Sequence, residues 1–96
     1  MNDDKYIFFK LYIIKQAPTS PEIILKLKSF LDSNFKNCYV LDVIDILAHP
    51  DKAVMDNVMA SPTLIKDKPY PQKRVVGSIH FSRLLADLNL YNYVIN

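Results

Sequence analysis

The sequence predicts a single α/β domain, residues 1–96, with elements in the order βαβ-α-ββ-α. Three observations predict it. Two apolar runs rich in β-branched and aromatic residues flank a segment whose apolar residues recur at helical spacing. Two short strand-like runs follow a proline-punctuated stretch, and a second segment of helical spacing ends the chain. The length favours one core, because single domains usually occupy about 100–150 residues.

The first half has the pattern of a βαβ unit. Tyr6–Ile14 lacks clean alternation, so we expect a central strand that is covered on both faces. Thr19 or Ser20 then caps a helix with Pro21 in its first turn. Cys38–Leu47 is a second strand, parallel to the first through a right-handed crossover. The helix places these apolar residues on one side: Ile23, Leu27, Phe30, Leu31 and Phe35.

The second half is marked by prolines and by the only glycine. Pro50 opens a helix through about Ala60, with an apolar face of Val54, Met55, Val58 and Met59. A strand begins at Pro62 in "ASPTLIK", and "RVVGS" forms an antiparallel hairpin with it across "DKPYPQK". Ser78 caps a last helix that carries Phe81, Leu84, Leu85, Leu88 and Tyr91.

Pro62 and Gly77 are the residues that we expect to determine the local fold of this half. A cis bond before Pro62 would reverse the chain into the third strand. A lone glycine at the end of a strand usually needs φ > 0 or a close backbone approach.

Composition excludes several classes of protein. The net charge is +2 and the 12 Lys and Arg residues are scattered, so we expect no nucleic-acid partner. The N-terminus "MNDDKYIFFK" is acidic, unlike a signal peptide. Lys10 and Lys15 interrupt the most apolar segment, which is too short to span a bilayer. With one cysteine, no disulfide is possible within the chain, and a cytoplasmic location with no membrane association is expected.

The element order is that of thioredoxin-like domains, which carry thiols at the start of their first helix. Here that region reads "KQAPTSP" and contains no cysteine, so disulfide exchange is excluded there. Cys38 is interpreted as a small buried hydrophobe. His49 and His80 lack a second ligand at metal-binding spacing, and strand alternation separates Asp42 from Asp45. We therefore expect no catalytic residue, no metal, no cofactor and no enzymatic activity.

Two surfaces keep two interpretations each. Met55 and Met59 are either core packing of a short helix, the more common case, or an adaptable partner-binding face. The C-terminal "LYNYVIN", with Tyr91, Tyr93 and Val94, is either an oligomer interface or simple packing of the last helix.

Read in order, these residues resemble one family, the KaiB-like proteins of the circadian-clock system. The resemblance rests on "KLYIIKQAPTS", "VLDVIDILAHPDKAVMDNVMASPTLIK" and "PYPQKRVVG", and covers nearly the whole chain from Tyr6 to Tyr91. It implies a thioredoxin-like fold without thiols and a non-enzymatic protein that binds KaiC, a RecA-like ring ATPase, in timing or stress control. It also implies self-association into a homodimer or homotetramer.

The resemblance further implies a metamorphic chain, in which the second half adopts either the thioredoxin-like packing or the alternative KaiB ground-state packing. Residues 48–80 are weakly specified locally, as two packings of similar free energy require. Lys66, Lys73 and Arg74 flank the hairpin and are the candidate partner-binding residues, with solvated charges as the alternative. The alternative functions are a SasA-like sensor domain and a diverged thioredoxin-fold redox protein.

Several positions differ from the family pattern. Lys15-Gln16 stands where the family usually has Gly-Asn, Asp42 where it has a lysine, and Ser78 where it has an acidic residue. A charge reversal at an interface normally removes or changes the partner. The sequence therefore leaves open whether a KaiA-type partner is bound, and which packing and oligomeric state are populated.

Overall fold

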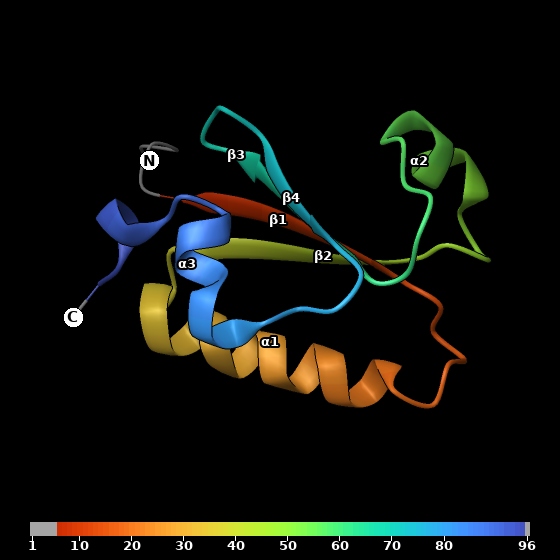
Figure 1. Cartoon of the computed structure of the whole chain (residues 1–96), viewed down its shortest axis with the longest axis horizontal. Helices are drawn as coiled ribbons and strands as arrows, with labels where there is room; N and C mark the ends of the chain where they lie inside the picture. The colour runs from red at the N-terminus through yellow and green to blue at the C-terminus, as the bar shows by residue number, and fades with distance from the viewer. Residues whose placement is uncertain (1–5, 96) are drawn as a thin grey trace.

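The computed structural model describes residues 6–95, which form one mixed four-stranded sheet in the order β2-β1-β3-β4 (Figure 1). The interior strand β1 (Ile7–Ile13) pairs in parallel with β2 (Tyr39–Asp45). On its other side it pairs antiparallel with β3 (Thr63–Lys68), which forms a hairpin with β4 (Lys73–Val76). The predicted central strand, parallel crossover and hairpin are confirmed, and the sheet is thioredoxin-like.

Helix α1 (Ser20–Phe35) forms where the apolar spacing predicted it, with Pro21 in the first turn. Its buried side chains Leu27, Leu31 and Phe35 pack on the sheet, and the Phe35 ring centroid lies 6.1 Å from that of Phe9. The predicted N-cap position is confirmed at Thr19, but the expected capping hydrogen bond is missing. The Ser20 hydroxyl donates instead to the Ile14 carbonyl (2.6 Å).

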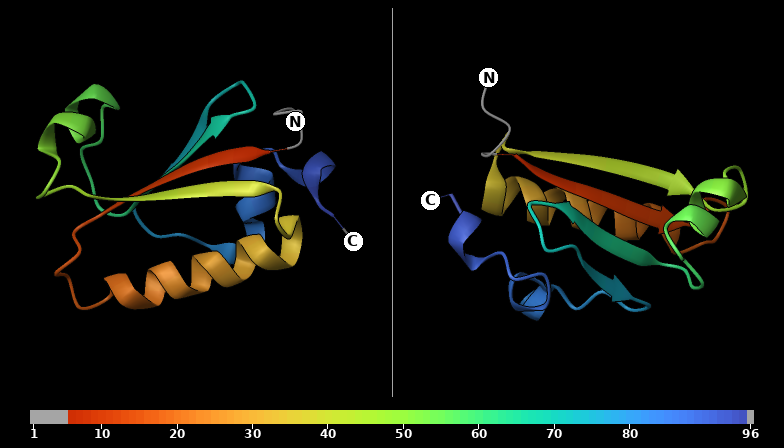
Figure 2. Two further views of the ribbon diagram at one scale, coloured as in Figure 1. Left: turned by 180° about the vertical axis from the view of Figure 1, so that it is seen from behind. Right: turned by 90° about the horizontal axis from the view of Figure 1, so that it is seen from above.

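The helices divide unequally between the two faces of the sheet (Figure 2). On one face, α1 and the C-terminal segment cover the larger core, in which Leu27, Leu64 and Leu84 are buried together. On the opposite face, the short helix α2 (Pro50–Met55) covers only one end of the strands. The small core beneath it consists of Tyr12, Ile44, Ala53 and Ile65. Among residues 6–95, no other helix covers this second face, and much of it is therefore left open.

Helix α2 is shorter than the sequence predicted, because it ends at Met55 rather than near Ala60. Asn57 adopts a left-handed conformation (φ +55°) directly after the Asp56 cap. The Asn57 amide donates to the Val54 carbonyl (3.1 Å), and the Val58 amide donates to the Ala53 carbonyl (2.8 Å). This is the Schellman pattern that terminates helices, and asparagine is one of the few residues that adopt it readily.

The C-terminal segment is also less helical than predicted. A 3-10 turn η2 (Phe81–Arg83), the short helix α3 (Leu84–Asp87) and a turn η3 (Tyr91–Tyr93) replace one continuous helix. Ser78 is not its cap, since His80 holds that position without a capping hydrogen bond. Asn89 (φ +57°) ends α3 in the same way as Asn57 ends α2. The Asn89 amide donates to the Ala86 carbonyl, and the Leu90 amide donates to the Leu85 carbonyl.

Gly77 and Pro62 meet at the end of the hairpin. Gly77 has φ +83°, as expected of a lone glycine at the end of a strand, and its amide donates to the Pro62 carbonyl (2.8 Å). The Ser61–Pro62 bond is cis, also as expected. Cys38 departs from its prediction, because β2 begins at Tyr39 and the thiol-bearing residue lies half-buried just before the strand.

Candidate functional site

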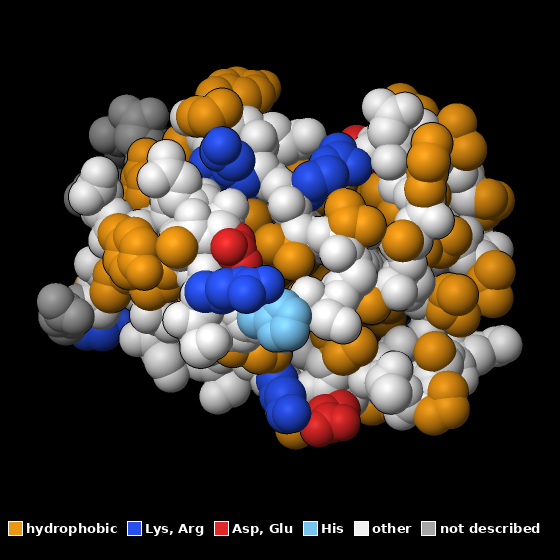
Figure 3. Space-filling view, in the orientation of Figure 1, with side chains coloured by type: hydrophobic (Ala, Val, Ile, Leu, Met, Phe, Trp, Pro, Cys, Tyr) orange, Lys and Arg blue, Asp and Glu red, His pale blue; other side chains and the backbone are white. Residues whose placement is uncertain are grey.

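The α2 surface, which we define as Leu47, Val54, Met55 and Met59, exposes four large apolar side chains. Their exposed fractions are 63%, 74%, 81% and 95% respectively. Hydrophobic side chains accordingly gather on the side of the molecule that carries α2 (Figure 3). Only Ala53 of α2 is buried, because the early end of the helix leaves one short turn to face the sheet. The core-packing interpretation of Met55 and Met59 is therefore wrong for this structure.

A polar cluster beneath α2 fastens the helix to the sheet. The buried Tyr12 hydroxyl donates to Asp56 Oδ2 (2.5 Å) and lies 3.1 Å from the Lys52 carbonyl oxygen. Lys10 Nζ also contacts Asp56 Oδ2 (3.1 Å). These contacts join the central strand to the last turn of α2, and they set the orientation in which the α2 surface is presented.

The electrostatics of this cluster favour its bonded form. Burial, followed by the hydrogen bond to Asp56 and its negative charge, raises the pKa of Tyr12. For Asp56, burial acts to raise the pKa, but hydrogen bonds from Tyr12 and Lys10 and the charges of Lys10 and Arg74 lower it overall. Near neutral pH the tyrosine therefore donates and the carboxylate accepts.

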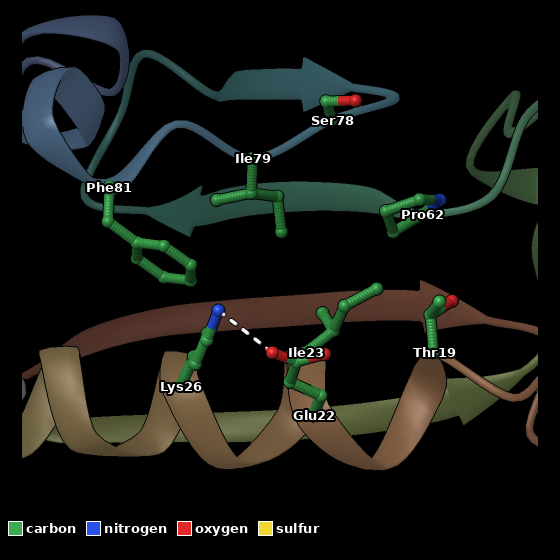
Figure 4. A pocket seen from close by; sticks show the side chains of 8 residues that line it. All are labelled: Thr19, Glu22, Ile23, Lys26, Pro62, Ser78, Ile79 and Phe81. Atoms are coloured by element: carbon green, nitrogen blue, oxygen red, sulfur yellow. Dashed lines mark ion pairs between the residues drawn. The ribbon is translucent and has the colours of Figure 1, made fainter.

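A pocket of about 360 Å³ lies beside Pro62, where thioredoxin-like enzymes carry their thiols (Figure 4). Ile23 of α1, Pro62, Ile79 and Phe81 supply its apolar lining. Its remaining lining residues are Thr19, Glu22, Lys26 and Ser78, and Glu22 and Lys26 form an ion pair (3.0 Å). No lining residue is a thiol, so the position of the pocket is that of a redox site but its chemistry is not.

The three candidate partner-binding cations have different environments. Lys73 is exposed, whereas Arg74 is half-buried and donates to the Gln72 side chain (3.1 Å) and the Asn57 carbonyl (3.4 Å). Lys66 is only 2% exposed, which removes it from the candidate surface in this packing. Its register opposite Phe9 turns it toward the larger core, because paired residues share a face of the sheet. Burial, with the nearby charge of Lys73, lowers the pKa of Lys66.

The remaining polar candidates lie apart from one another. His49 and His80 are both exposed at the starts of short helices. Asp42 is exposed, while Asp45 Oδ1 accepts from the amides of Lys15 (3.3 Å) and Leu47 (3.2 Å) and so acts as a turn cap. Within residues 6–95, no cluster of three or more His, Cys, Asp or Glu side chains could hold a metal ion. In the same range, no helix is long and apolar enough to cross a membrane.

Sequence reasoning did not single out Tyr12 and Asp56, which lie 44 residues apart. Tyr12 was included only as one apolar residue of a strand. The sequence did contain one signal, the asparagine in Asp56-Asn57-Val58. An asparagine in this position can end a helix, and it would have placed the Asp56 carboxylate at the C-terminal end of α2.

Fold and site together define a thioredoxin-like domain that lacks the thiols of that fold and presents an exposed apolar helix. The family model described as the KaiB domain matches residues 10–88. The chain belongs to the KaiB family.

Curated relatives agree with this assignment. The chain is 39% identical over 79 residues to the circadian clock oscillator protein KaiB of Prochlorococcus marinus (strain NATL2A), covering 82% of this chain and 74% of the relative. It is 37% identical over 79 residues to the protein of the same name from Synechococcus elongatus (strain ATCC 33912 / PCC 7942 / FACHB-805), covering 82% and 78%.

Among solved structures, the N-terminal domain of Synechococcus elongatus SasA has the same fold. The TM-score is 0.71 at 19% identity, with 92% of this chain and 82% of that chain covered. At this identity the similarity concerns the fold alone.

Proposed function

We propose that this chain is a non-enzymatic interaction module that binds a KaiC-type RecA-like ATPase in timing or stress control in the cytoplasm. The KaiB family membership supports the kind of partner. The observation that carries the proposal is the exposed α2 surface, because large apolar side chains exposed together on one side of a small domain are typical of protein–protein contact. Methionine side chains adapt their shape to a partner at low cost.

The absence of thiols supports the non-enzymatic part of the proposal. The pocket beside Pro62 offers no nucleophilic sulfur, and Cys38 is half-buried elsewhere. A diverged redox protein would depend on Cys38, the only cysteine in the chain. If a Cys38→Ser variant functions as the wild type does, the thiol is not required, and the redox alternative is excluded.

Isothermal titration calorimetry with the purified ATPase tests the proposal. Met55→Asp places a charge on the α2 surface and is expected to weaken binding by about tenfold or more, because a desolvated charge without a partner disfavours association. Leu25→Asp is the matched control, since Leu25 is 71% exposed on α1, away from α2. Equal affinities for wild type and Met55→Asp would contradict the assignment of the surface, and no binding by wild type would contradict the function.

The second candidate is a SasA-like sensor module, since this chain shares the fold of the SasA domain. It predicts a stable thioredoxin-like monomer. The KaiB-like proposal instead includes a homodimer or homotetramer and a second packing of residues 48–80. Light scattering with NMR separates the two, because a monomer with one set of amide peaks supports the sensor. An oligomer, or a second set of slowly exchanging peaks confined to residues 48–80, supports the KaiB-like proposal.

A further inference from the structure

The tip of the β3–β4 hairpin presents an exposed aromatic residue. Tyr70 is 77% exposed, and a proline lies on each side of it, Pro69 and Pro71. Figure 1 shows that the hairpin tip and α2 project to the same side of the sheet, at opposite ends. The hairpin therefore stands beside the sheet face that α2 leaves uncovered.

Side-chain hydrogen bonds hold this tip in shape. Gln72 Nε2 donates to Asp67 Oδ1 across the loop (3.0 Å), and Arg74 Nη2 donates to Gln72 Oε1 (3.1 Å). Arg74 Nη1 reaches the Asn57 carbonyl (3.4 Å), which ties the hairpin to the segment after α2. The two prolines restrict the backbone further. An aromatic side chain on such a preorganised loop loses little conformational entropy on binding.

Cationic side chains flank Tyr70 along the hairpin. Lys68, Lys73 and Arg74 lie outside the core, whereas Lys66 is buried, and the one acidic side chain of residues 66–76, Asp67, already accepts from Gln72. Lys68 is exposed, and its Nζ lies 6.0 Å from the centroid of the Phe8 ring. Lys73 is exposed at the start of β4. A partner surface that faces the tip would therefore need to be acidic.

We propose that Tyr70 is an anchor residue that inserts into a recess in an acidic protein surface, with Lys68 and Lys73 pairing with carboxylates at its rim. This inference rests on the proposed function, because it supplies the KaiC-type ATPase with a second contact besides the α2 surface. Tyrosine and arginine are enriched among residues that dominate interface energies, whereas a lone ring with few cations is a poor nucleic-acid site.

The affinity of the full chain for the ATPase, measured by calorimetry at two salt concentrations, tests the inference. Tyr70→Ala is expected to weaken binding by about tenfold or more, and Tyr70→Phe by less, because the ring supplies most of the buried area. Tyr91→Ala is the matched control, since Tyr91 is 63% exposed in η3 near the C-terminus, and should change affinity by less than about twofold.

The charges have their own readout. The double variant Lys68→Glu, Lys73→Glu is expected to weaken binding and to flatten its salt dependence, whereas Lys28→Glu with Lys36→Glu, exposed on and after α1, makes the same charge change elsewhere. If the wild-type chain binds the ATPase and Tyr70→Ala binds it equally well, the hairpin inference is overturned but the proposed function stands. If the wild-type chain does not bind the ATPase, both are overturned. Tyr70-dependent binding to single-stranded DNA but not to the ATPase also overturns it.

Discussion

Lys66 occupies a core position in β3, although its residue type belongs on a surface. It pairs with Phe9 on one side and with Lys73 on the other, and only 2% of it is exposed. The sequence "TLIKDK" does not reveal this burial, because β3 lies in the sheet interior and both of its faces are partly covered. Strand alternation places Lys66 on the same face as Leu64, which is buried in the larger core, and the pairing with Phe9 agrees with this placement.

The lowered pKa of Lys66 makes the stability depend on pH. The unfolded chain holds this proton up to about its ordinary value of 10.5, whereas the folded chain releases it earlier. Between the lowered folded pKa and 10.5 the unfolded state binds more protons, so this residue makes the free energy of unfolding rise with pH. Below the folded pKa the full cost of burying the charge is present.

Lys66→Met removes that cost and should raise the free energy of unfolding near pH 7 by on the order of 1 kcal/mol. The gain should shrink toward pH 10, and urea denaturation at both pH values measures it. Lys28→Met on the exposed side of α1 is the control and should change neither value by more than about 0.5 kcal/mol. A Lys66→Met variant less stable than wild type at pH 7 would contradict this account of the residue.

At the scale of elements, α2 is held by few contacts. One residue of the helix is buried, and the Tyr12–Asp56–Lys10 cluster supplies the polar contacts to the central strand. Such an element opens locally at a lower free energy than the rest of the sheet. Because α2 is short, its apolar side chains are exposed, and its attachment to the central strand depends on the Asp56 carboxylate.

Tyr12→Phe removes a hydrogen bond to a partly buried charge and should cost about 1–3 kcal/mol. Hydrogen exchange is expected to accelerate in the α2 amides of Ala53 and Asp56 more than in those of β1. Tyr39→Phe is a close control, because it removes a tyrosine–aspartate bond of the same length (2.5 Å to Asp32) far from α2. Burial and the bond to Asp32 raise the pKa of Tyr39 to about 12, so it too donates at neutral pH. Equal acceleration in both variants would contradict a specific tether.

The element prediction succeeded where apolar spacing was long and failed where a single residue ended a helix. The strands and α1 follow from continuous patterns that leave one arrangement, a right-handed βαβ unit with an added hairpin. The lengths of α2 and α3 were decided instead by Asn57 and Asn89 in left-handed conformations. Apolar periodicity continues past both residues, so it could not reveal where the helices stop.

For the whole molecule, the candidate site was only partly predictable. Residue identity alone shows that the start of the first helix carries no thiol. It also raised the possibility that Met55 and Met59 bind a partner. The choice between core and surface for Met55 required the tertiary structure, since α2 touches the sheet at one end only. The sequence does not mark Tyr70 as a binding residue, because its exposure at a projecting hairpin tip is visible only in the folded structure.

The central claim is that this domain, through the α2 surface, binds a KaiC-type ATPase. The most direct test is a pull-down of the tagged full chain from its native cells, with the captured proteins identified by mass spectrometry. We predict that the ATPase is captured by wild type and by Leu25→Asp, and is lost with Met55→Asp. Capture without a KaiC-type ATPase, or equal capture of it by Met55→Asp, would contradict the account.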